Sequence, residues 1–180
     1  MTSNRKIICY IASSLDGYIA KPNDDLSFLQ MAEKPGEDYG YSSFVAGIDT
    51  VILGRKTYDW VMRQVTEFPH TDKETFVITR QPRPAIGKTT FYTGNLADLI
   101  ASLQANPGKD IFIDGGSELI HSLLQLKLID EFIISVIPVI LGAGTRLFRE
   151  GFPEQALTLV SVKPFEKGLV QLHYSKNRVD

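Results

Sequence analysis

The sequence predicts an α/β protein with three layers, α/β/α, in which a mostly parallel central sheet ends in an antiparallel hairpin. Apolar runs of strand length alternate with helix-periodic segments through the middle of the chain, the order typical of a parallel sheet covered on both faces. At the end, Leu157 to Pro164 and Gly168 to Tyr174 alternate around the turn Glu166-Lys167-Gly168. That pattern predicts the closing hairpin.

Composition limits the classes of protein to consider. The chain has 180 residues and 43% apolar content, which fits one domain spanning residues 1–180. Nineteen basic residues against 21 acidic ones leave a formal charge of −2. Such a charge provides no electrostatic attraction to nucleic acid or to an anionic membrane, so we expect neither partner.

The cysteine content and the hydropathy pattern predict a soluble, cytoplasmic protein. Cys9 is the only cysteine and lies in the apolar run Ile7 to Ile11, so no internal disulfide can form and a buried, reduced thiol is expected. The polar start Met1 to Lys6 does not resemble a signal peptide. No apolar run reaches the length of a membrane span.

The first third of the chain predicts a strand, a turn and two helices. Lys6 to Ala12 is apolar nearly throughout, as in a central strand. Asp16-Gly17 follows as a turn signal. Asp24 or Asp25 then caps a short helix, and Tyr41 to Ile48 has a second helical pattern.

A strand running into a helix through a glycine is the central feature of the sequence. Thr50 to Gly54 has strand character, and a helix follows in which Tyr58, Val61 and Met62 face a core, with Trp60 also expected in the core. The start of a helix has unpaired N–H groups and a positive dipole end, so Gly54-Arg55-Lys56-Thr57 can hold an anion. We expect that anion to be a phosphate.

A second junction of the same kind follows later in the chain. Asp110 to Asp114 predicts a buried strand, and Gly115-Gly116-Ser117 leads directly into a helix. The junction can hold phosphate oxygens, or it can be a simple turn. Neither junction matches the Gly-x-Gly-x-x-Gly or Walker patterns, so the usual dinucleotide and triphosphate folds are not indicated.

Between and after these junctions the sequence predicts three more strands and a capped helix. The strands are Glu74 to Thr79, Thr89 to Thr93 and Phe132 to Leu141, and the helix starts at its cap Asn95 and ends near Pro107-Gly108.

Four stretches together resemble the dihydrofolate reductase-like superfamily. They are Leu15-Asp16-Gly17, Leu53-Gly54-Arg55-Lys56-Thr57-Tyr58, Ile111-Phe112-Ile113-Asp114-Gly115-Gly116 and the run Pro138 to Phe148. The run Pro138 to Phe148 resembles more narrowly the reductase domain of the bifunctional riboflavin-pathway deaminase-reductase. The resemblance covers nearly the whole chain, from Lys6 to Tyr174.

The resemblance implies a mixed sheet of about eight strands with NADPH across the carboxyl ends of its strands. The implied cofactor-binding residues are Gly54, Arg55, Lys56, Thr57, Thr79, Arg80, Gly115, Gly116, Ser117 and Thr145. Arg55 and Arg80 are cations that NADH would not require, because a guanidinium suits the extra phosphate of NADPH. The other interpretation of each arginine is a solvated surface charge.

Reduction of a C=N or C=O bond also needs a proton, and two carboxyl groups are candidates. Asp25 resembles the position of the carboxylate that contacts the pterin in dihydrofolate reductases, and Asp16 is the second candidate. The alternative for Asp25 is a helix cap. The riboflavin-type relatives often have Asp-Leu-Asp-Trp-Leu here, whereas this chain has Asp25-Leu26-Ser27-Phe28-Leu29.

These observations predict a free-standing NADPH-dependent reductase of a small molecule, such as the ribosylaminopyrimidine of riboflavin synthesis or another heterocycle or carbonyl. The chain lacks the zinc pattern of the deaminase, and its histidines lack metal-ligand spacing, so no metal is expected. The resemblance also implies a homodimer, with Phe132 to Leu141 as a hypothetical interface. The alternatives are an authentic dihydrofolate reductase, a non-catalytic NADPH-binding paralogue and a structural α/β domain that binds nothing.

Overall fold

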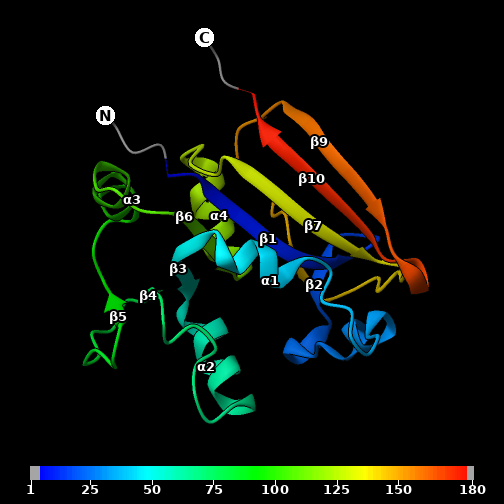
Figure 1. Cartoon of the computed structure of the whole chain (residues 1–180), viewed down its shortest axis with the longest axis horizontal. Helices are drawn as coiled ribbons and strands as arrows, with labels where there is room; N and C mark the ends of the chain where they lie inside the picture. The colour runs from blue at the N-terminus through cyan, green and yellow to red at the C-terminus, as the bar shows by residue number, and fades with distance from the viewer. Residues whose placement is uncertain (1–4, 178–180) are drawn as a thin grey trace.

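The computed structural model describes residues 5–177, and its main feature is one eight-stranded sheet (Figure 1). The strands of this sheet are β1 Ile7–Ser14, β3 Ile48–Gly54, β4 Glu74–Ile78, β5 Thr89–Tyr92, β6 Asp110–Gly115, β7 Glu131–Ile137, β9 Leu157–Pro164 and β10 Val170–Lys176. A separate two-stranded sheet pairs β2 Tyr18–Ala20 with β8 Thr145–Arg146.

Within residues 5–177, four α-helices and three short 3-10 helices connect the strands. The α-helices are α1 Tyr41–Ala46, α2 Arg55–Gln64, α3 Leu96–Ala105 and α4 Ser117–Gln125, and the 3-10 helices are η1 Pro22–Asp24, η2 Ser27–Ala32 and η3 Glu166–Gly168.

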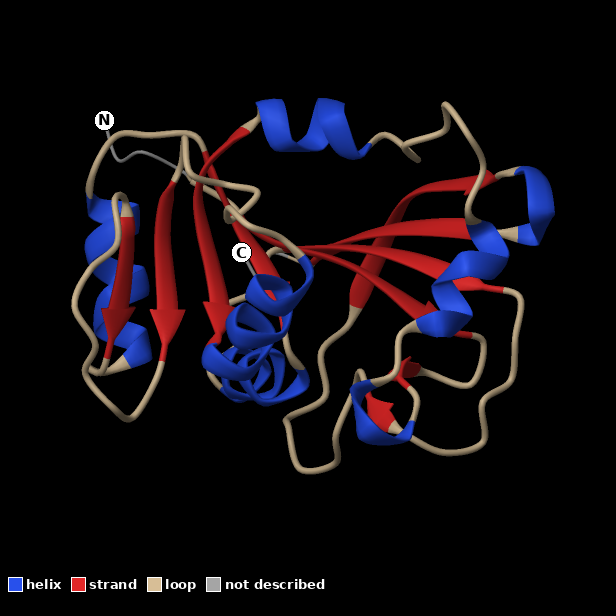
Figure 2. Ribbon diagram, turned by 90° about the horizontal axis from the view of Figure 1, so that it is seen from below, coloured by secondary structure: helices blue, strands red, loops and turns tan. Residues whose placement is uncertain are grey.

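The strand order is β5-β4-β3-β6-β1-β7-β10-β9, and the first six strands in that order run parallel. β10 is antiparallel to both β7 and β9, so the chain closes with the expected antiparallel hairpin. Figure 2 shows the strong twist of the sheet from one edge to the other. The predicted α/β class with a mostly parallel sheet is confirmed.

Helices cover both faces of the sheet. On one face, α3 and α4 pack their apolar sides on β1 and β6, in a core that includes Ile7, Ile113 and Leu123. On the other face, α1 and α2 pack on β3 and β6 around Val51, Tyr58 and Phe112. Alternate residues of one strand point to opposite faces, so β6 supplies Ile113 to the first core and Phe112 to the second.

Several element boundaries differ from the sequence prediction. The helix expected to run to Ile48 ends at Ala46, and Ile48 already begins β3. The strand expected to reach Leu141 ends at Ile137, because Pro138 lacks the N–H that the ladder needs. Asn95 caps α3 as predicted, its side chain accepting hydrogen bonds from the amides of Ala97 and Asp98 at 2.8 and 3.2 Å.

The β2–β8 pair was not predicted from the sequence, since each strand is only two or three residues long. Gly144 allows the two backbones to approach closely, because a Cβ atom at this position would lie 2.0 Å from the Ala20 carbonyl oxygen. The φ of Gly144 is +136°. Asp16 fixes the same region, because its carboxylate accepts hydrogen bonds from the Leu141 amide at 3.0 Å and the Gly142 amide at 2.7 Å.

Candidate functional site

A large cleft of about 1790 Å³ opens at the carboxyl ends of the parallel strands. Gly54 ends β3, Ile78 ends β4, and Asp114 lies next to the end of β6; all three line this cleft. Open α/β sheets bind their ligands at this edge, because the loops and helix starts gather there. The cleft is therefore the candidate site.

The two glycine junctions meet in the cleft. β3 and β6 are neighbours in the sheet, and Leu53 pairs with Gly115. A Cβ atom on Gly54 would lie 3.7 Å from the Gly116 amide nitrogen, and one on Gly116 would lie 3.1 Å from the Thr57 hydroxyl oxygen. Two turns that are far apart in sequence thus lie against each other, with the tighter contact at Gly116.

Ser117 gives this junction a free polar group. It is the first residue of α4, it lines the cleft, and it is only 7% exposed. Within residues 5–177 its hydroxyl oxygen has no protein hydrogen-bond partner. A buried, unpartnered hydroxyl beside the positive end of a helix is suited to an anionic oxygen.

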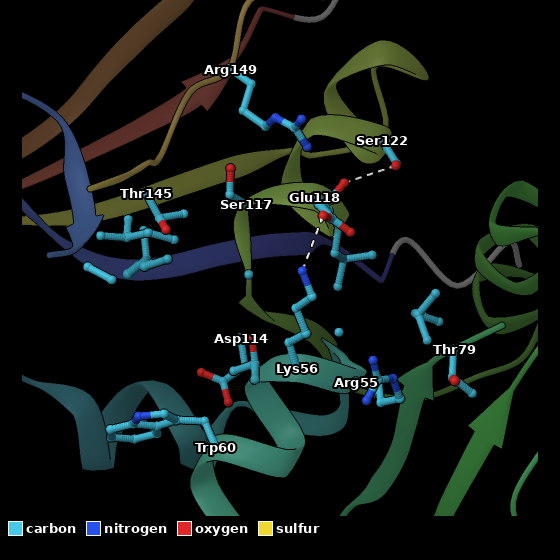
Figure 3. Close-up of a pocket in the computed structure, with 18 of the residues that line it drawn as sticks. Arg55, Lys56, Trp60, Thr79, Asp114, Ser117, Glu118, Ser122, Thr145 and Arg149 are labelled. Carbon is cyan, nitrogen blue, oxygen red and sulfur yellow. Dashed lines mark hydrogen bonds and ion pairs between the residues drawn. The ribbon is translucent and has the colours of Figure 1, made fainter. Parts of the chain in front are cut away.

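The basic side chains around the turns differ in whether a carboxylate already pairs with their charge. Arg55 pairs with Asp59 of its own helix at 2.8 Å. Lys56 reaches Glu118 across the two turns at 3.8 Å, and both side chains are exposed, so this pair is weak (Figure 3). Arg80 is exposed and lines the cleft at the end of β4.

Two threonines expected to bind the cofactor also line the cleft. The Thr79 hydroxyl both accepts from the Gln81 amide at 3.1 Å and donates to the Gln81 carbonyl at 3.2 Å, so it shapes its own turn. Thr145 lies in β8 and pairs with Ala20. Gly115 is not among the lining residues, although its neighbour Gly116 is.

The other end of the cleft is an aromatic chamber on the α1/α2 face of the sheet. We define the chamber by the lining residues Tyr10, Leu26, Leu29, Tyr41, Trp60, Val61, Phe112 and Asp114. Figure 3 shows Asp114 with Lys56 beside it and Trp60 below, whereas Ser117 and Arg149 lie higher in the view.

Asp114 is the chamber's ionisable group with the most unusual environment. Burial raises the pKa of its carboxyl to about 7. None of the described residues donates a hydrogen bond to the Asp114 carboxyl or forms an ion pair with it. A carboxyl that titrates near neutrality in a cleft can hold and release a proton.

The two carboxyl groups expected to be catalytic lie outside the cleft lining. Asp25 is exposed, and its carboxylate accepts hydrogen bonds from the Ser27 amide at 2.7 Å and the Ser27 hydroxyl at 3.1 Å, which lower its pKa. The N-cap of η2 is Leu26, and η2 has no side-chain cap hydrogen bond, so Asp25 forms a local turn with Ser27 rather than the cap considered as the alternative. Hydrogen bonding, first from the Ser14 hydroxyl and then from the Leu141 and Gly142 amides, lowers the pKa of Asp16 to about 2.

Sequence reasoning missed two residues of this site. Asp114 was noted only as part of a motif, although a carboxylate that ends an otherwise apolar strand run, Ile111 to Ile113, is a signal of a site. Trp60 was expected in the core. That prediction was wrong, because Trp60 is only half-buried and its ring forms part of the cleft wall, while Tyr58 and Val61 pack on the sheet.

The sheet order and a cleft between two glycine turns define a reductase-like α/β fold of the dihydrofolate reductase type. The dihydrofolate reductase of Enterococcus faecalis, solved with NADP(H), has the same fold at a TM-score of 0.66 and 19% identity over 99% of this chain and 100% of that one.

The chain belongs to the RibD C-terminal domain family, whose model matches residues 5–171. It is 43% identical to "Uncharacterized protein YwjB" of Bacillus subtilis (strain 168), over 94% of this chain and 97% of that protein. A crystal structure from Shewanella sp. PV-4, whose name assigns it provisionally to riboflavin biosynthesis, superposes with a TM-score of 0.87. The two chains are 31% identical, with 96% of this chain and 99% of that one covered. None of the helices described here is long and apolar enough to cross a membrane.

Proposed function

We propose that this protein is an NADPH-dependent reductase of a small molecule, with the cofactor's pyrophosphate between the two glycine turns. The observation that carries the proposal is the buried, unpartnered Ser117 hydroxyl at the start of α4, next to Gly116, whose backbone lies against Gly54 and Thr57 at the start of α2. The family and the fold support the same class of activity.

The residues of the cleft fit NADPH. Gly54, Thr57, Gly116 and Ser117 would hold the pyrophosphate with backbone N–H groups and hydroxyls. Arg80, at the end of β4, would contact the adenosine 2′-phosphate, and Arg55 would add a second cation while remaining paired with Asp59. When bound, NADPH supplies the reducing equivalent.

Asp114 would supply the proton. Its carboxyl lines the aromatic chamber, where the substrate would lie, and its raised pKa keeps it partly protonated near neutrality. The chamber's rings would orient the substrate and exclude water from the reacting atoms. Asp25 and Asp16 stay predictions as proton donors, tested by the same assay.

Substrate identity and assembly belong to the same proposal. The ribosylaminopyrimidine of riboflavin synthesis stays a candidate substrate, as do other heterocycles and carbonyls.

For the homodimer, edge strand β9 offers the exposed apolar residues Leu159, Val160 and Val162. β7, which contains most of the stretch first considered, is paired on both sides within the sheet. Sedimentation mass tests the dimer, and a monomeric mass contradicts it.

Cofactor titration tests the proposal directly. We expect saturable NADPH binding to the wild-type protein and weaker NADH binding, and we expect Arg80→Ala to bring the two affinities together. Arg63→Ala is the matched control, because Arg63 lies in the last turn of α2 outside the cleft lining. Equal NADPH affinity in wild type, Arg55→Ala and Arg80→Ala would favour a structural domain instead.

The remaining alternatives give different outcomes in a substrate panel. Rapid NADPH oxidation with dihydrofolate and tight inhibition by antifolates would identify an authentic dihydrofolate reductase. NADPH binding without turnover of any substrate would identify a non-catalytic paralogue.

A further inference from the structure

Gln171 is a buried amide on β10, a strand from which no described residue lines the cleft. Its side chain belongs to a residue that is only 8% exposed, and β7 separates β10 from β1 in the sheet (Figure 1). The Gln171 Nε2 atom lies 2.9 Å from the Tyr10 hydroxyl, 3.1 Å from the Tyr39 carbonyl and 3.2 Å from the Ser135 hydroxyl. One side chain therefore connects β1, β7 and the segment before α1.

The contact with Tyr39 determines which way round this amide lies. A carbonyl oxygen can only accept, so the atom that faces the Tyr39 carbonyl must be the nitrogen of Gln171. The Tyr10 hydroxyl also donates to this carbonyl, at 3.0 Å, which leaves its own oxygen free to accept from Gln171. Each of the three groups thus bonds with the other two, and such a network is weakened as a whole when one member is lost.

The network holds two walls of the aromatic chamber. Tyr10 lines the chamber, and its ring packs on Phe44 of α1 with centroids 4.8 Å apart. Tyr39 lies two residues before α1, whose first residue, Tyr41, also lines the chamber. The Tyr10 and Tyr41 rings meet edge to face, with centroids 5.6 Å apart. A shift of the Gln171 amide would therefore move both rings.

The turn of the β9–β10 hairpin contacts the same stretch of chain. The Tyr39 ring packs edge to face on Phe165, with centroids 5.0 Å apart, and the Lys167 ammonium donates to the Glu33 carbonyl at 2.6 Å. The chamber residue Leu29 packs in the same apolar cluster as both rings. The hairpin thus contacts the chamber wall at two places, its turn and its buried amide.

A buried amide gives the chamber something that an apolar side chain would not. An apolar residue of the same shape would fill the space in β10 without requiring hydrogen-bond partners, so stability alone does not call for Gln171. Apolar contacts have no preferred direction, whereas hydrogen bonds do. The amide therefore fixes the orientation of the Tyr10 ring and the start of α1.

We propose that Gln171 is a positioning residue of the reductase, which from outside the cleft fixes the shape of the space where the nicotinamide ring and the substrate meet. The inference rests on the proposed function, because the reducing end of NADPH must contact the substrate at the border of the chamber. Gln171 itself does not line the cleft. It should therefore affect the surroundings of the nicotinamide ring and leave the affinity for the cofactor's phosphates unchanged.

Gln171→Met tests the proposal, because methionine fills a similar volume but donates no hydrogen bond. The probe is NADPH, whose reduced nicotinamide becomes more fluorescent in a rigid, apolar site. We expect the emission of bound NADPH to fall by about half in Gln171→Met, with an affinity within about twofold of wild type. Gln104→Met is the matched control, because the Gln104 amide also donates to a backbone carbonyl, that of Arg5 at 3.2 Å, outside the cleft lining.

A double-mutant cycle separates positioning from packing. Tyr10→Phe keeps the ring and removes only the hydroxyl that bonds to Gln171. If Gln171 acts through this bond, Tyr10→Phe should also lower the emission, and the double variant should lose no more than the larger of the two single losses. Where Gln171→Met does not fold, as judged by thermal melting, Tyr10→Phe decides alone.

Hydrogen exchange gives a measurement without cofactor. The Phe44 amide donates to the Gly40 carbonyl at 3.0 Å in the first turn of α1. This amide should exchange faster in Gln171→Met than in wild type or in Gln104→Met, because the start of α1 loses its anchor.

Three results would overturn the proposal. They are equal emission of bound NADPH in wild type and in the folded variants Gln171→Met or Tyr10→Phe, an equal loss in Gln104→Met, and additive losses in the double-mutant cycle. Each of these results leaves the reductase assignment standing, because NADPH still binds. Absence of NADPH binding to the wild type would remove that assignment, and this inference with it.

Discussion

The two ends of the cleft share one sheet edge but are built from different chemistry. Around the glycine turns, the binding groups are backbone amides, helix starts, the Ser117 hydroxyl and exposed cations. In the aromatic chamber they are ring faces and the single acid Asp114. The first end suits an anion such as a phosphate, and the second offers apolar rings beside one carboxyl group. Substitutions in the aromatic chamber should therefore change substrate specificity without changing the affinity for the cofactor.

The largest effect is expected on the turnover number of the Asp114→Asn variant, with little change in cofactor affinity. Asp114→Asn removes the proton donor and should lower kcat by roughly 10²- to 10⁴-fold, the usual contribution of general acid catalysis. NADPH affinity should stay within about twofold, because the Asp114 carboxyl is not one of the groups proposed to hold the phosphates of the cofactor. Steady-state kinetics and cofactor titration check both values. Asp25→Asn and Asp16→Asn serve as comparisons, and a larger loss in either would move the proton donor there.

At the cofactor end, the opposite pattern is expected. Ser117→Ala removes a hydroxyl that has no other described partner, so NADPH affinity should fall by about 1–2 kcal/mol, or roughly 5- to 30-fold. The melting temperature without cofactor should hardly change. Ser122→Ala is the matched control, because the Ser122 hydroxyl also lines the cleft but already donates to the Glu118 carbonyl at 2.9 Å. Equal losses in both variants would contradict a specific role for Ser117.

A backbone change should act on both ends together. Gly144→Ala places a methyl group against the Ala20 carbonyl at a positive φ and should destabilise the protein by about 1–3 kcal/mol. The β2–β8 pair borders the cleft, so cofactor and substrate affinities should weaken in parallel. Gly151→Ala has a positive φ but open space around it, so it measures the backbone strain alone. Chemical denaturation measures the loss of unfolding free energy in each variant. Equal losses in Gly144→Ala and Gly151→Ala would contradict the steric argument.

The pH dependence of stability offers a smaller effect. The folded-state pKa of Asp114 is raised to about 7, so the native state holds more protons than the unfolded state between about pH 4 and pH 7. Wild-type stability should therefore fall as pH rises through this window, relative to Asp114→Asn. Because the cleft is open to water, we expect a relative loss of only about 1–2 kcal/mol. Parallel stability curves for the two proteins would show that the carboxyl is not perturbed.

The smallest effect concerns Asp16. In Asp16→Ala the amides of Leu141 and Gly142 lose their acceptor, so both should exchange with solvent faster while the amides of β6 keep their protection. Native-state hydrogen exchange measures this change. Unchanged protection of the two amides would show that the carboxylate does not hold this loop.

Much of the fold could be predicted from the sequence, because the parallel strands and their helices have strong local periodicity. Both glycine turns were found in the same way, and they do meet, since β3 and β6 are neighbours in the sheet. The chamber could not be predicted. Tyr10, Tyr41 and Phe112 come from three separate elements and look like ordinary core residues, and only the tertiary arrangement gives them a common free surface.

The cleft takes no lining residue after Glu150 in the part of the chain that the structure describes, and β10 reaches the site only indirectly, through the hydrogen bond from Gln171 Nε2 to the Tyr10 hydroxyl at 2.9 Å. Substitutions of the exposed β9 residues Leu159, Val160 and Val162 should therefore leave ligand recognition intact. The same separation makes the exposed side chains of β9 suitable attachment points for a surface anchor or a fluorescent label, because none of them lines the cleft.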